Sequence, residues 1–202
     1  MSTQPAIGFW QVMPIITSLL ALVFIYTNAR FSIRNKQADL IIHFHKQFDE
    51  MQKKRCELLV AQAELASGSA GAWTPERINV EAEMFFDRFW SLQFDQFLAW
   101  YEGHLPTSIY IYWVFSRWRE LHQPSAGWTV CASTLASTLD TLNIRWQKNQ
   151  DKSSRLSAHL TSFFGLMFAL KQNAASAEVE EQLGHFGPSA ARRFGRWLFG
   201  AY

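Results

Sequence analysis

An uncharged, strongly apolar stretch near the start of the chain constrains its structure more than any other feature. Residues 7–27 read IGFWQVMPIITSLLALVFIYT and contain no Asp, Glu, Lys or Arg. As a helix that rises about 1.5 Å per residue, this stretch would span roughly 30 Å, which matches the hydrocarbon core of a bilayer. Trp10 and Tyr26 lie near its two ends, where aromatic side chains favour the membrane interface, and Gln11 lies in the outer third, where a polar group costs least. The stretch predicts a transmembrane anchor.

The flanks of this stretch favour an uncleaved anchor over a signal peptide, and they set its orientation. A signal peptide begins with a positively charged region, whereas residues 1–6, MSTQPA, contain no Lys or Arg. A core helix of a soluble protein is seldom apolar on every face over this length. Arg30, Arg34 and Lys36 follow the stretch and no basic residue precedes it. We therefore expect a single-pass protein with its N-terminus outside and its body in the cytoplasm.

A helical period continues beyond the anchor. Positions 41, 44, 48, 51, 55, 58, 62 and 65 hold Ile, Phe, Phe, Met, Arg, Leu, Gln and Leu, a spacing that puts them on one helix face. No Gly or Pro occurs between Pro14 and Gly68, so we expect one long helix to run from the anchor into the cytoplasm. Arg55 and Gln62 weaken a strict coiled coil. The predicted packing seam, against a neighbouring copy or against the body, consists of Ile41, Phe44, Phe48, Met51 and Leu58.

The remainder of the chain predicts an all-α body, because no alternating strand pattern with hairpin turns occurs. We expect an anchor at 1–29, a continuation helix at 30–66, a linker at 67–74, a helical bundle at 75–188 and a basic-aromatic segment at 189–202. Within the bundle, helices are predicted over about 75–103, 105–122, 129–147 and 152–172, with a short acidic helix ended by Gly184 and by Gly187-Pro188. Thr74 and Pro75 suit the start of the first of these helices, whose aromatic residues on nearly every face predict the most buried position.

Composition and motifs exclude several classes of function. A charged fraction of 18% and a net charge of +2 are typical neither of a disordered chain nor of a nucleic-acid binder. Cys56 and Cys131 form no motif and are interpreted as buried, inert thiols. His43 and His45 point about 200° apart on a helix and cannot share an ion. The chain has no H-E-x-x-H, P-loop or G-x-S-x-G sequence, so we expect neither a metal nor a cofactor.

Arg117 and His122 are the one candidate for catalysis. In RWRELH they have the Arg-x4-His spacing, which resembles the motif of HEPN ribonucleases. That resemblance implies general acid-base catalysis by His122, stabilisation of phosphorane charge by Arg117, and RNA as a partner. Trp118 stands where HEPN motifs have a polar residue. The alternative, which we favour, is a solvated helix end with diverging side chains, in which Arg117 pairs with Glu120.

The whole arrangement also resembles a group of small bacterial inner-membrane proteins with one anchor and a cytoplasmic helical bundle. These include the membrane accessory proteins of RNA-targeting type VI-B CRISPR loci. The resemblance implies antiviral defence and assembly in the membrane. Nine Trp and 17 Phe exceed what a bundle of this size can readily bury, which favours a homo-oligomer or a cytoplasmic protein partner.

The C-terminal segment, SAARRFGRWLFGAY, differs in kind from the bundle. Basic residues alternate with aromatic ones, a pattern that suits the headgroup layer of an anionic leaflet. The alternative is a terminal helix docked on the bundle with solvated arginines. The residues predicted to touch the bilayer here are Arg192, Arg193, Arg196 and Trp197.

Overall fold

The computed structural model describes residues 9–68, 73–122, 128–148, 155–172 and 178–187. This part of the chain is all-α, as predicted, and contains six helices. Their bounds are α1 Phe9–Ala66, α2 Pro75–Tyr101, α3 Thr107–His122, α4 Leu135–Lys148, α5 Arg155–Gln172 and α6 Glu178–Phe186.

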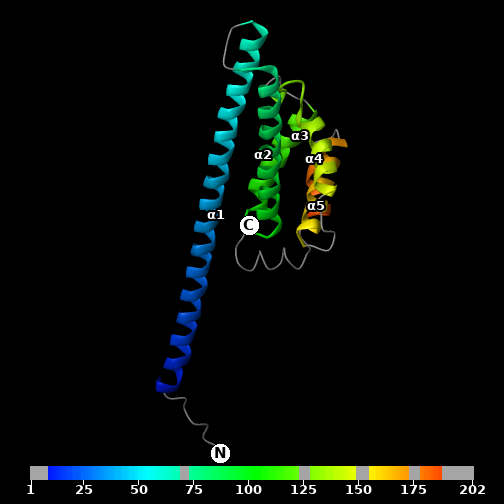
Figure 1. The fold of residues 1–202 in the computed structure, drawn as a ribbon. Coiled ribbons are helices and arrows are strands. Elements are labelled where there is room, and N and C mark those ends of the chain that lie inside the picture. The colour runs from blue at the N-terminus through cyan, green and yellow to red at the C-terminus, as the bar shows by residue number, and fades with distance from the viewer. Residues whose placement is uncertain (1–8, 69–72, 123–127, 149–154, 173–177, 188–202) are drawn as a thin grey trace, which may run out of the picture.

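The long helix α1 forms one edge of the molecule (Figure 1). Its N-terminal part extends well beyond the body, and α2 runs back alongside its C-terminal half. The helices α3, α4 and α5 contact α2, and α6 packs on α3 and α5. The prediction of one uninterrupted helix from the anchor into the body is confirmed, since α1 spans 58 residues and ends directly before Ser67 and Gly68.

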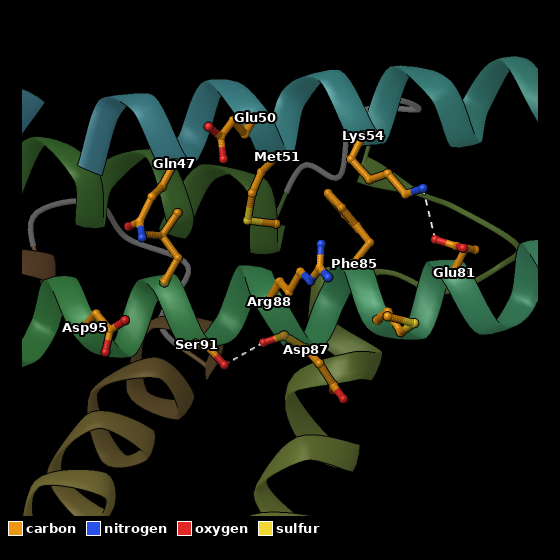
Figure 2. Close-up of a pocket in the computed structure, with 12 residues that line it drawn as sticks. Gln47, Glu50, Met51, Lys54, Glu81, Phe85, Asp87, Arg88, Ser91 and Asp95 are labelled. Atoms are coloured by element: carbon orange, nitrogen blue, oxygen red, sulfur yellow. Dashed lines mark hydrogen bonds and ion pairs between the residues drawn. The ribbon is translucent and has the colours of Figure 1, made fainter. Parts of the chain in front are cut away.

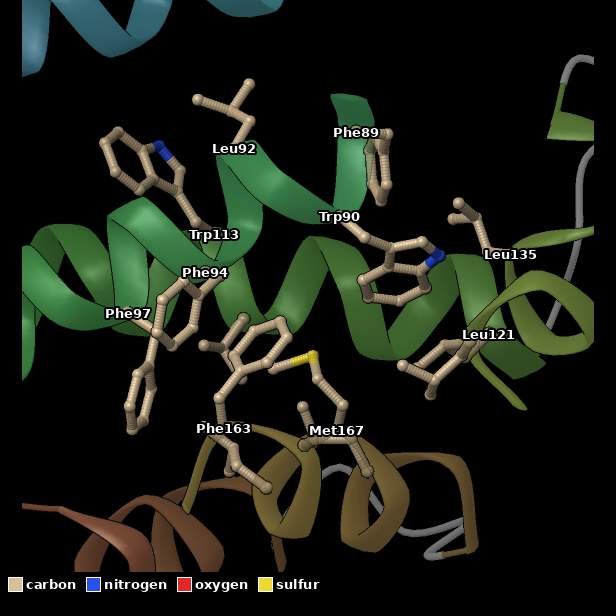
Figure 3. Packing of buried hydrophobic residues seen from close by; sticks show 14 of the residues in the cluster. Phe89, Trp90, Leu92, Phe94, Phe97, Trp113, Leu121, Leu135, Phe163 and Met167 are labelled. Carbon is tan, nitrogen blue, oxygen red and sulfur yellow. The ribbon is translucent and has the colours of Figure 1, made fainter. Parts of the chain in front are cut away.

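Local interactions determine where the central helix α2 begins and ends. The side chain of Thr74 accepts a hydrogen bond of 3.2 Å from the backbone N–H of Arg77, and Pro75 fills the first helical position. The chain turns at Gly103, whose φ of 89° lies in the left-handed region that favours glycine. The helix α2 carries twelve buried residues, more than any other described helix, and Figure 3 shows its aromatic side chains packed on α3 and α5. The fully buried side chains at this centre include Phe89, Trp90, Phe97, Phe163 and Met167.

The predicted seam on α1 packs against the body of the same chain. Phe44 and Leu58 are buried in the common core, and Ile41, Phe48 and Met51 are half-buried against it. The two polar positions of the seam both contact the segment before α4. The guanidinium of Arg55 lies 4.7 Å from the ring centre of Trp128, and Oε1 of Gln62 accepts a hydrogen bond of 3.3 Å from the backbone N–H of Cys131. The sequence predicts that this seam packs against a neighbouring copy or against the body, and in the structure it packs against the body.

The start of α4 corrects the predicted helix at 129–147, because α4 begins only at Leu135. Val130 and Ser133 exchange two backbone hydrogen bonds of 3.0 and 2.9 Å, and Cys131 and Ala132 between them have φ values of 53° and 63°. An L-residue cannot continue a right-handed helix through such angles. Trp128 and Val130 are buried, so packing of these two side chains holds the segment in its turn.

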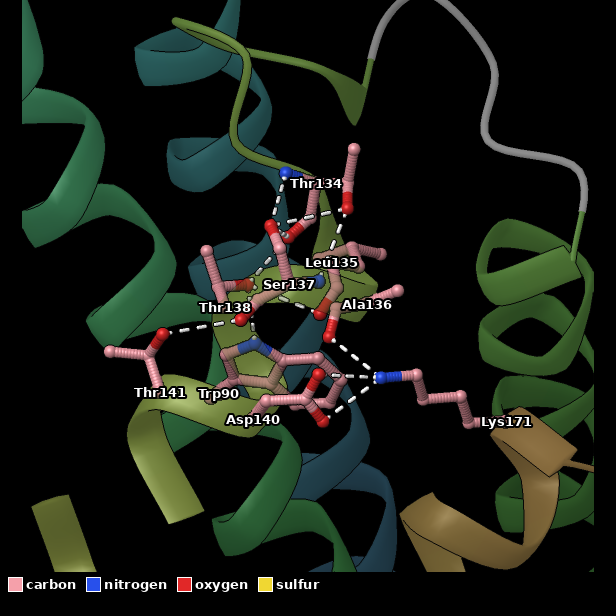
Figure 4. A network of polar contacts seen from close by, with 9 residues as sticks. All are labelled: Trp90, Thr134, Leu135, Ala136, Ser137, Thr138, Asp140, Thr141 and Lys171. Atoms are coloured by element: carbon pink, nitrogen blue, oxygen red, sulfur yellow. Dashed lines mark hydrogen bonds and ion pairs between the residues drawn. The ribbon is translucent and has the colours of Figure 1, made fainter. Parts of the chain in front are cut away.

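Polar contacts fix the first turn of α4 and tie it to α2 and α5 (Figure 4). The hydroxyl of Thr134 accepts a hydrogen bond of 3.2 Å from the backbone N–H of Ser137, which caps the helix. Nε1 of Trp90 donates to the hydroxyl of Thr138 at 3.1 Å. Lys171 on α5 forms an ion pair of 2.7 Å with Asp140. These contacts fix the orientation of α4, and its buried Leu135, Leu139 and Leu142 hold it on the core.

The helix α6 ends at Phe186, directly before Gly187-Pro188, one of the two breaks that the sequence predicts for it; the other, Gly184, does not end it. Val179 and Leu183 are buried, and Phe186 packs on α5, where a Cβ at Gly165 would lie 2.5 Å from its ring. Tertiary packing on both sides of Gly184 therefore outweighs the low helix propensity of that residue.

Candidate functional site

The N-terminal part of α1 exposes an apolar surface that nothing in the described chain covers. Every side chain from 13 to 29 is exposed, and Leu20 and Phe24 retain 64% and 66% of their accessible surface. Among the described residues, Met13–Ala66 is one helix long and apolar enough to cross a membrane, and none of its most apolar window is buried. A helix buried in a soluble core would show the opposite. The structure thus shows a long, apolar, exposed N-terminal helix.

Polar groups within this apolar part of α1 are satisfied by the helix itself. The hydroxyl of Ser18 donates to the carbonyl of Pro14 at 2.7 Å, and that of Thr27 donates to the carbonyl of Val23 at 3.0 Å. At the far end, the guanidinium of Arg30 lies 5.7 Å from the ring centre of Tyr26. The side chains of Trp10 and Gln11 lie outside the described residues.

Arg117 is buried between three helices, which corrects its prediction as a solvated helix end. Its side chain is 5% exposed, and its guanidinium lies 5.1 Å from the ring centre of Phe48 on α1 and 5.0 Å from that of Phe89 on α2. Its Nε donates a hydrogen bond of 2.7 Å to Oε1 of Gln93. Its Nη1 is buried with no hydrogen-bond partner among the described residues.

The electrostatics of Arg117 follow from this burial. Removal from water lowers the pKa of Arg117 to about 10, an effect that the charge of nearby Glu120 and the hydroxyl of Tyr110 only partly oppose. The predicted ion pair with Glu120 is wrong, because Gln93 takes the hydrogen bond and Arg117 forms no ion pair within the described part of the chain. The spacing of Tyr110, Val114, Arg117 and Leu121 already puts Arg117 on the buried stripe of α3. That spacing is the sequence signal that identifies its burial.

His122 has a different environment from Arg117. Its Nδ1 lies 2.9 Å from the carbonyl oxygen of Trp118, one turn earlier in α3, and its ring lies 5.2 Å from the ring of Trp118. A carbonyl accepts hydrogen bonds, so Nδ1 carries the proton in this contact. Arg117 is held by α1 and α2, whereas His122 is held by its own helix. The two side chains share no contact, and neither lines the grooves described next.

A charged groove lies between α1 and α2 (Figure 2). Its volume is about 400 Å³, and its apolar surface comes from Met51, Met84, Phe85 and Leu92. The groove also presents four carboxylates and two cations; these are Glu50, Glu81, Asp87 and Asp95, with Lys54 and Arg88. The sequence does not predict this groove, because the residues that line it come from two helices that meet only in the folded chain.

The carboxylates of this groove differ in their partners. Lys54 pairs with Glu81 at 2.9 Å and lowers the pKa of that carboxyl group, and Arg145 on α4 pairs with Asp87 at 2.6 Å. Glu50 and Asp95 form no ion pair within the described residues. Partial burial raises the pKa of Asp95, although the imidazole of His43 opposes this. Two acceptors of the groove therefore lack a cation.

A second groove, with a volume of about 910 Å³, lies at the end of the body nearest the exposed part of α1. Its apolar lining includes Ile33, Leu40 and Leu98. Here Nε2 of His159 lies 3.3 Å from a carboxylate oxygen of Glu102. This groove continues the apolar surface of α1 onto the body.

In the part of the chain that the structure describes, no three His, Cys, Asp or Glu side chains come close enough together to hold one metal ion. The thiol of Cys56 is exposed, which corrects its prediction as a buried residue. The thiol of Cys131 is half-buried, and burial raises its pKa. Exposure of Cys56 follows from its position, since it faces away from the seam that α1 buries.

Comparisons of the chain with protein-family models, with characterised proteins and with solved structures found no match.

Proposed function

We propose that this protein is anchored by α1 in the bacterial inner membrane and acts at the cytoplasmic face through self-association or through binding of a protein partner. The observation that carries the proposal is the apolar surface of residues 13–29, which is exposed along its whole length and belongs to the same helix that packs on the body. Burying exposed apolar surface gains about 25 cal/mol per Å², so a lipid environment would stabilise this part of the chain strongly.

Charge at the boundary of the apolar surface supports the orientation. Arg34 and Lys36 are exposed on α1 between the apolar part and the body, and Arg30 lies over Tyr26. Basic side chains at this position suit the anionic cytoplasmic leaflet. The body would then lie on the cytoplasmic side. Ile33, the first residue of α1 that lines a groove of the body, follows Tyr26 by a helical rise of about 10 Å.

The packing of the seam indicates how self-association would occur. Phe44 and Leu58 are used within the chain, so a second copy would contact the anchor rather than the 41–65 seam. Because Ser18 and Thr27 bond within their own helix, close packing of apolar side chains is the expected contact between anchors. We also propose, from the resemblance to membrane accessory proteins of CRISPR loci, that the assembly serves antiviral defence.

The alternative proposal is a membrane-tethered HEPN-like ribonuclease that uses Arg117 and His122 on RNA. It requires the guanidinium of Arg117 to leave the rings of Phe48 and Phe89 before it can contact a phosphate. The buried position of Arg117 therefore favours the non-enzymatic proposal.

Alkaline carbonate extraction and protease digestion test the membrane proposal. We expect the protein to stay in the pellet after carbonate treatment, and protease added to inverted inner-membrane vesicles to digest the body. Leu20→Arg combined with Phe24→Arg should release it, because each arginine costs about 3 kcal/mol at the centre of a membrane helix. Tyr112→Arg, at an exposed position of the body, is the control and should leave the protein in the pellet. Extraction of the unchanged protein would refute the anchor, and protection of the body would refute the orientation.

A further inference from the structure

The second groove, which lies beside residues 33–44 of α1, contains a buried hydrogen-bond donor without an acceptor. Gln37 lines the groove and is only 7% exposed, and its Nε2 is buried with no hydrogen-bond partner among the described residues. Burying an amide N–H without an acceptor is costly, because the hydrogen bond that it made to water is lost. The donor of Gln37 therefore points to a ligand that offers an acceptor oxygen inside this groove.

Most of the surface of the second groove is apolar. The groove's volume of about 910 Å³ falls within the range of roughly 300–1,000 Å³ that is typical of ligand sites. The apolar side chains that line it come from three helices; they are Ile33, Leu40 and Phe44 on α1, Leu98 and Ala99 on α2, and Leu156 on α5. Such a surface gains free energy when an aliphatic chain displaces water from it. An aliphatic chain is therefore the ligand chemistry that fits this part of the groove.

Charged side chains mark the two ends of the second groove. Because α2 runs back along α1 (Figure 1), Lys36 and Glu102 lie toward the end nearest the exposed part of α1, and Asp95 lies toward the other end. Glu102 is already engaged, since Nε2 of His159 lies 3.3 Å from its carboxylate oxygen. Lys36 is exposed and forms no ion pair within the described residues. Lys36 therefore places a positive charge one position from Gln37, which attracts an anionic group to this end.

The position of this end indicates the source of the ligand. The exposed, apolar part of α1 covers residues 13–29, and the groove begins at Ile33 on the same helix. In the membrane-anchored state proposed above, the end of the groove at Lys36 would lie beside the headgroups of the cytoplasmic leaflet. A phospholipid of that leaflet carries the three groups that the groove fits, which are an aliphatic chain, ester oxygens and a phosphate.

We propose that the second groove binds one phospholipid of the leaflet in which α1 is anchored. One acyl chain lies among Leu40, Phe44 and Leu98. A glycerol ester carbonyl accepts a hydrogen bond from Nε2 of Gln37, and the phosphate pairs with the ammonium of Lys36. The inference rests on the proposed function, because the membrane supplies the ligand. A lipid bound in this way holds the body at the bilayer surface through a contact that the anchor does not make.

Photo-crosslinking of the full chain in lipid nanodiscs tests this inference. The probe is a phosphatidylethanolamine with a diazirine on one acyl chain, and mass spectrometry identifies the linked residues. Links to residues 40–44, 98–99 and 156–159, besides links to the anchor at 13–29, are the expected result. Links confined to the anchor would overturn the inference and leave the membrane anchoring intact. Absence of links at 13–29 would instead refute the anchoring, so the two failures are distinguishable.

Links to the C-terminal segment are judged by the same criterion. The bilayer contacts predicted for this segment, through Arg192, Arg193, Arg196 and Trp197, lie outside the described residues. Links at 189–202 and at the anchor, without links in the groove, would also overturn the inference.

Two matched pairs of substitutions test the position of the lipid. Ala99→Phe places a ring inside the groove, whereas Ala38→Phe makes the same change at an exposed position of α1 outside it. Lys36→Glu reverses the charge beside the proposed phosphate, and Lys46→Glu makes the same reversal at an exposed position of α1 outside the groove. Each groove variant should lower the yield of groove links at least about threefold, and each control should leave it unchanged. An unchanged yield in either groove variant would refute the proposed position.

Gln37→Leu tests the buried donor through thermal unfolding, measured in delipidated detergent and again after phosphatidylethanolamine is added. Without lipid, the variant should be at least as stable as the unchanged protein, because it removes an amide N–H that has no acceptor. Added lipid should raise the melting temperature of the unchanged protein, and the rise should be about half as large or less in the variant. Equal rises in the two proteins would show that Gln37 donates to no lipid and would overturn the inference.

Discussion

Arg117 donates a hydrogen bond of 2.7 Å to Gln93, and within the described part of the chain Arg117 forms no ion pair. The bond joins α3 to α2, and the guanidinium also lies between the rings of Phe48 and Phe89, so one side chain contacts three elements. Two aromatic faces and one amide oxygen contact the guanidinium directly, and the charge of Glu120 acts on it without forming an ion pair. Such contacts require a flat cation that loses its hydration easily, which describes arginine and not lysine.

Replacement of Arg117 separates the role of its shape from that of its charge. Arg117→Lys should destabilise the protein by about 1–3 kcal/mol, because an ammonium group loses more hydration and cannot stack between two rings. Arg117→Met combined with Gln93→Leu should be as stable as the original or more so, since it removes two partly unsatisfied polar groups. Thermal unfolding followed by circular dichroism measures both. A lysine variant of unchanged stability would contradict this account of the contact.

The burial of Arg117 predicts no ribonuclease activity. We expect the purified protein to leave single-stranded and structured RNA intact, with no difference between the unchanged chain and His122→Ala. The reason is that the guanidinium is enclosed by Phe48 and Phe89 and cannot contact a phosphate. Cleavage that His122→Ala abolishes would establish the HEPN-like alternative instead.

The ion pair between Lys54 and Glu81 predicts a stability difference that depends on pH. The hydrogen bond from Lys54 lowers the pKa of Glu81, so its contribution is present above the ordinary glutamate pKa and is lost as pH falls through the lowered value. Glu81→Gln should therefore reduce the melting temperature at pH 7 and have a smaller effect near pH 3. Glu83→Gln, an exposed change on the same helix, serves as the control at both values.

Ala132 offers a test of the turn before α4. Its φ of 63° disfavours any residue with a Cβ, so Ala132→Gly should stabilise the protein by up to about 1 kcal/mol. The same change at Ala38, an exposed position within α1, should instead cost about 1 kcal/mol. Chemical denaturation of both variants gives the comparison. Equal effects at the two positions would show that the turn is not left-handed in solution.

The seam between α1 and the body predicts a large loss on truncation. Leu58→Ala should cost about 2–5 kcal/mol, because the side chain is fully buried and the cavity it leaves cannot collapse. Val60→Ala, two positions along the same helix but exposed, should change stability by less than about 0.5 kcal/mol. Denaturant titration is the measurement. A small effect at Leu58 would indicate that α1 does not pack on the body.

The elements predicted correctly from the sequence are those that local chemistry determines. Thr74 with Pro75 starts α2, and the absence of Gly and Pro after Pro14 keeps α1 continuous. The errors arise where distant contacts decide. Trp128 and Val130 enter the core and force a turn into what the sequence predicts as helix. The packing of Phe186 on Gly165 carries α6 past the predicted break at Gly184 to the second predicted break, at Gly187. The spacing of Arg117 from the apolar residues of α3 indicates its burial, but the sequence does not show which residues of α1 and α2 contact it.

Because α1 is uninterrupted, tilting one end of this helix moves its other end over a large distance. From Leu20 to Ala66 it rises about 70 Å without a Gly or Pro at which to bend, so a tilt of about 10° at one end displaces the other by roughly 12 Å. Because α2 is fixed along the C-terminal half of α1, the body must follow that displacement as a unit. In the proposed membrane-anchored state, small changes in bilayer thickness around α1 would therefore produce large movements of the body.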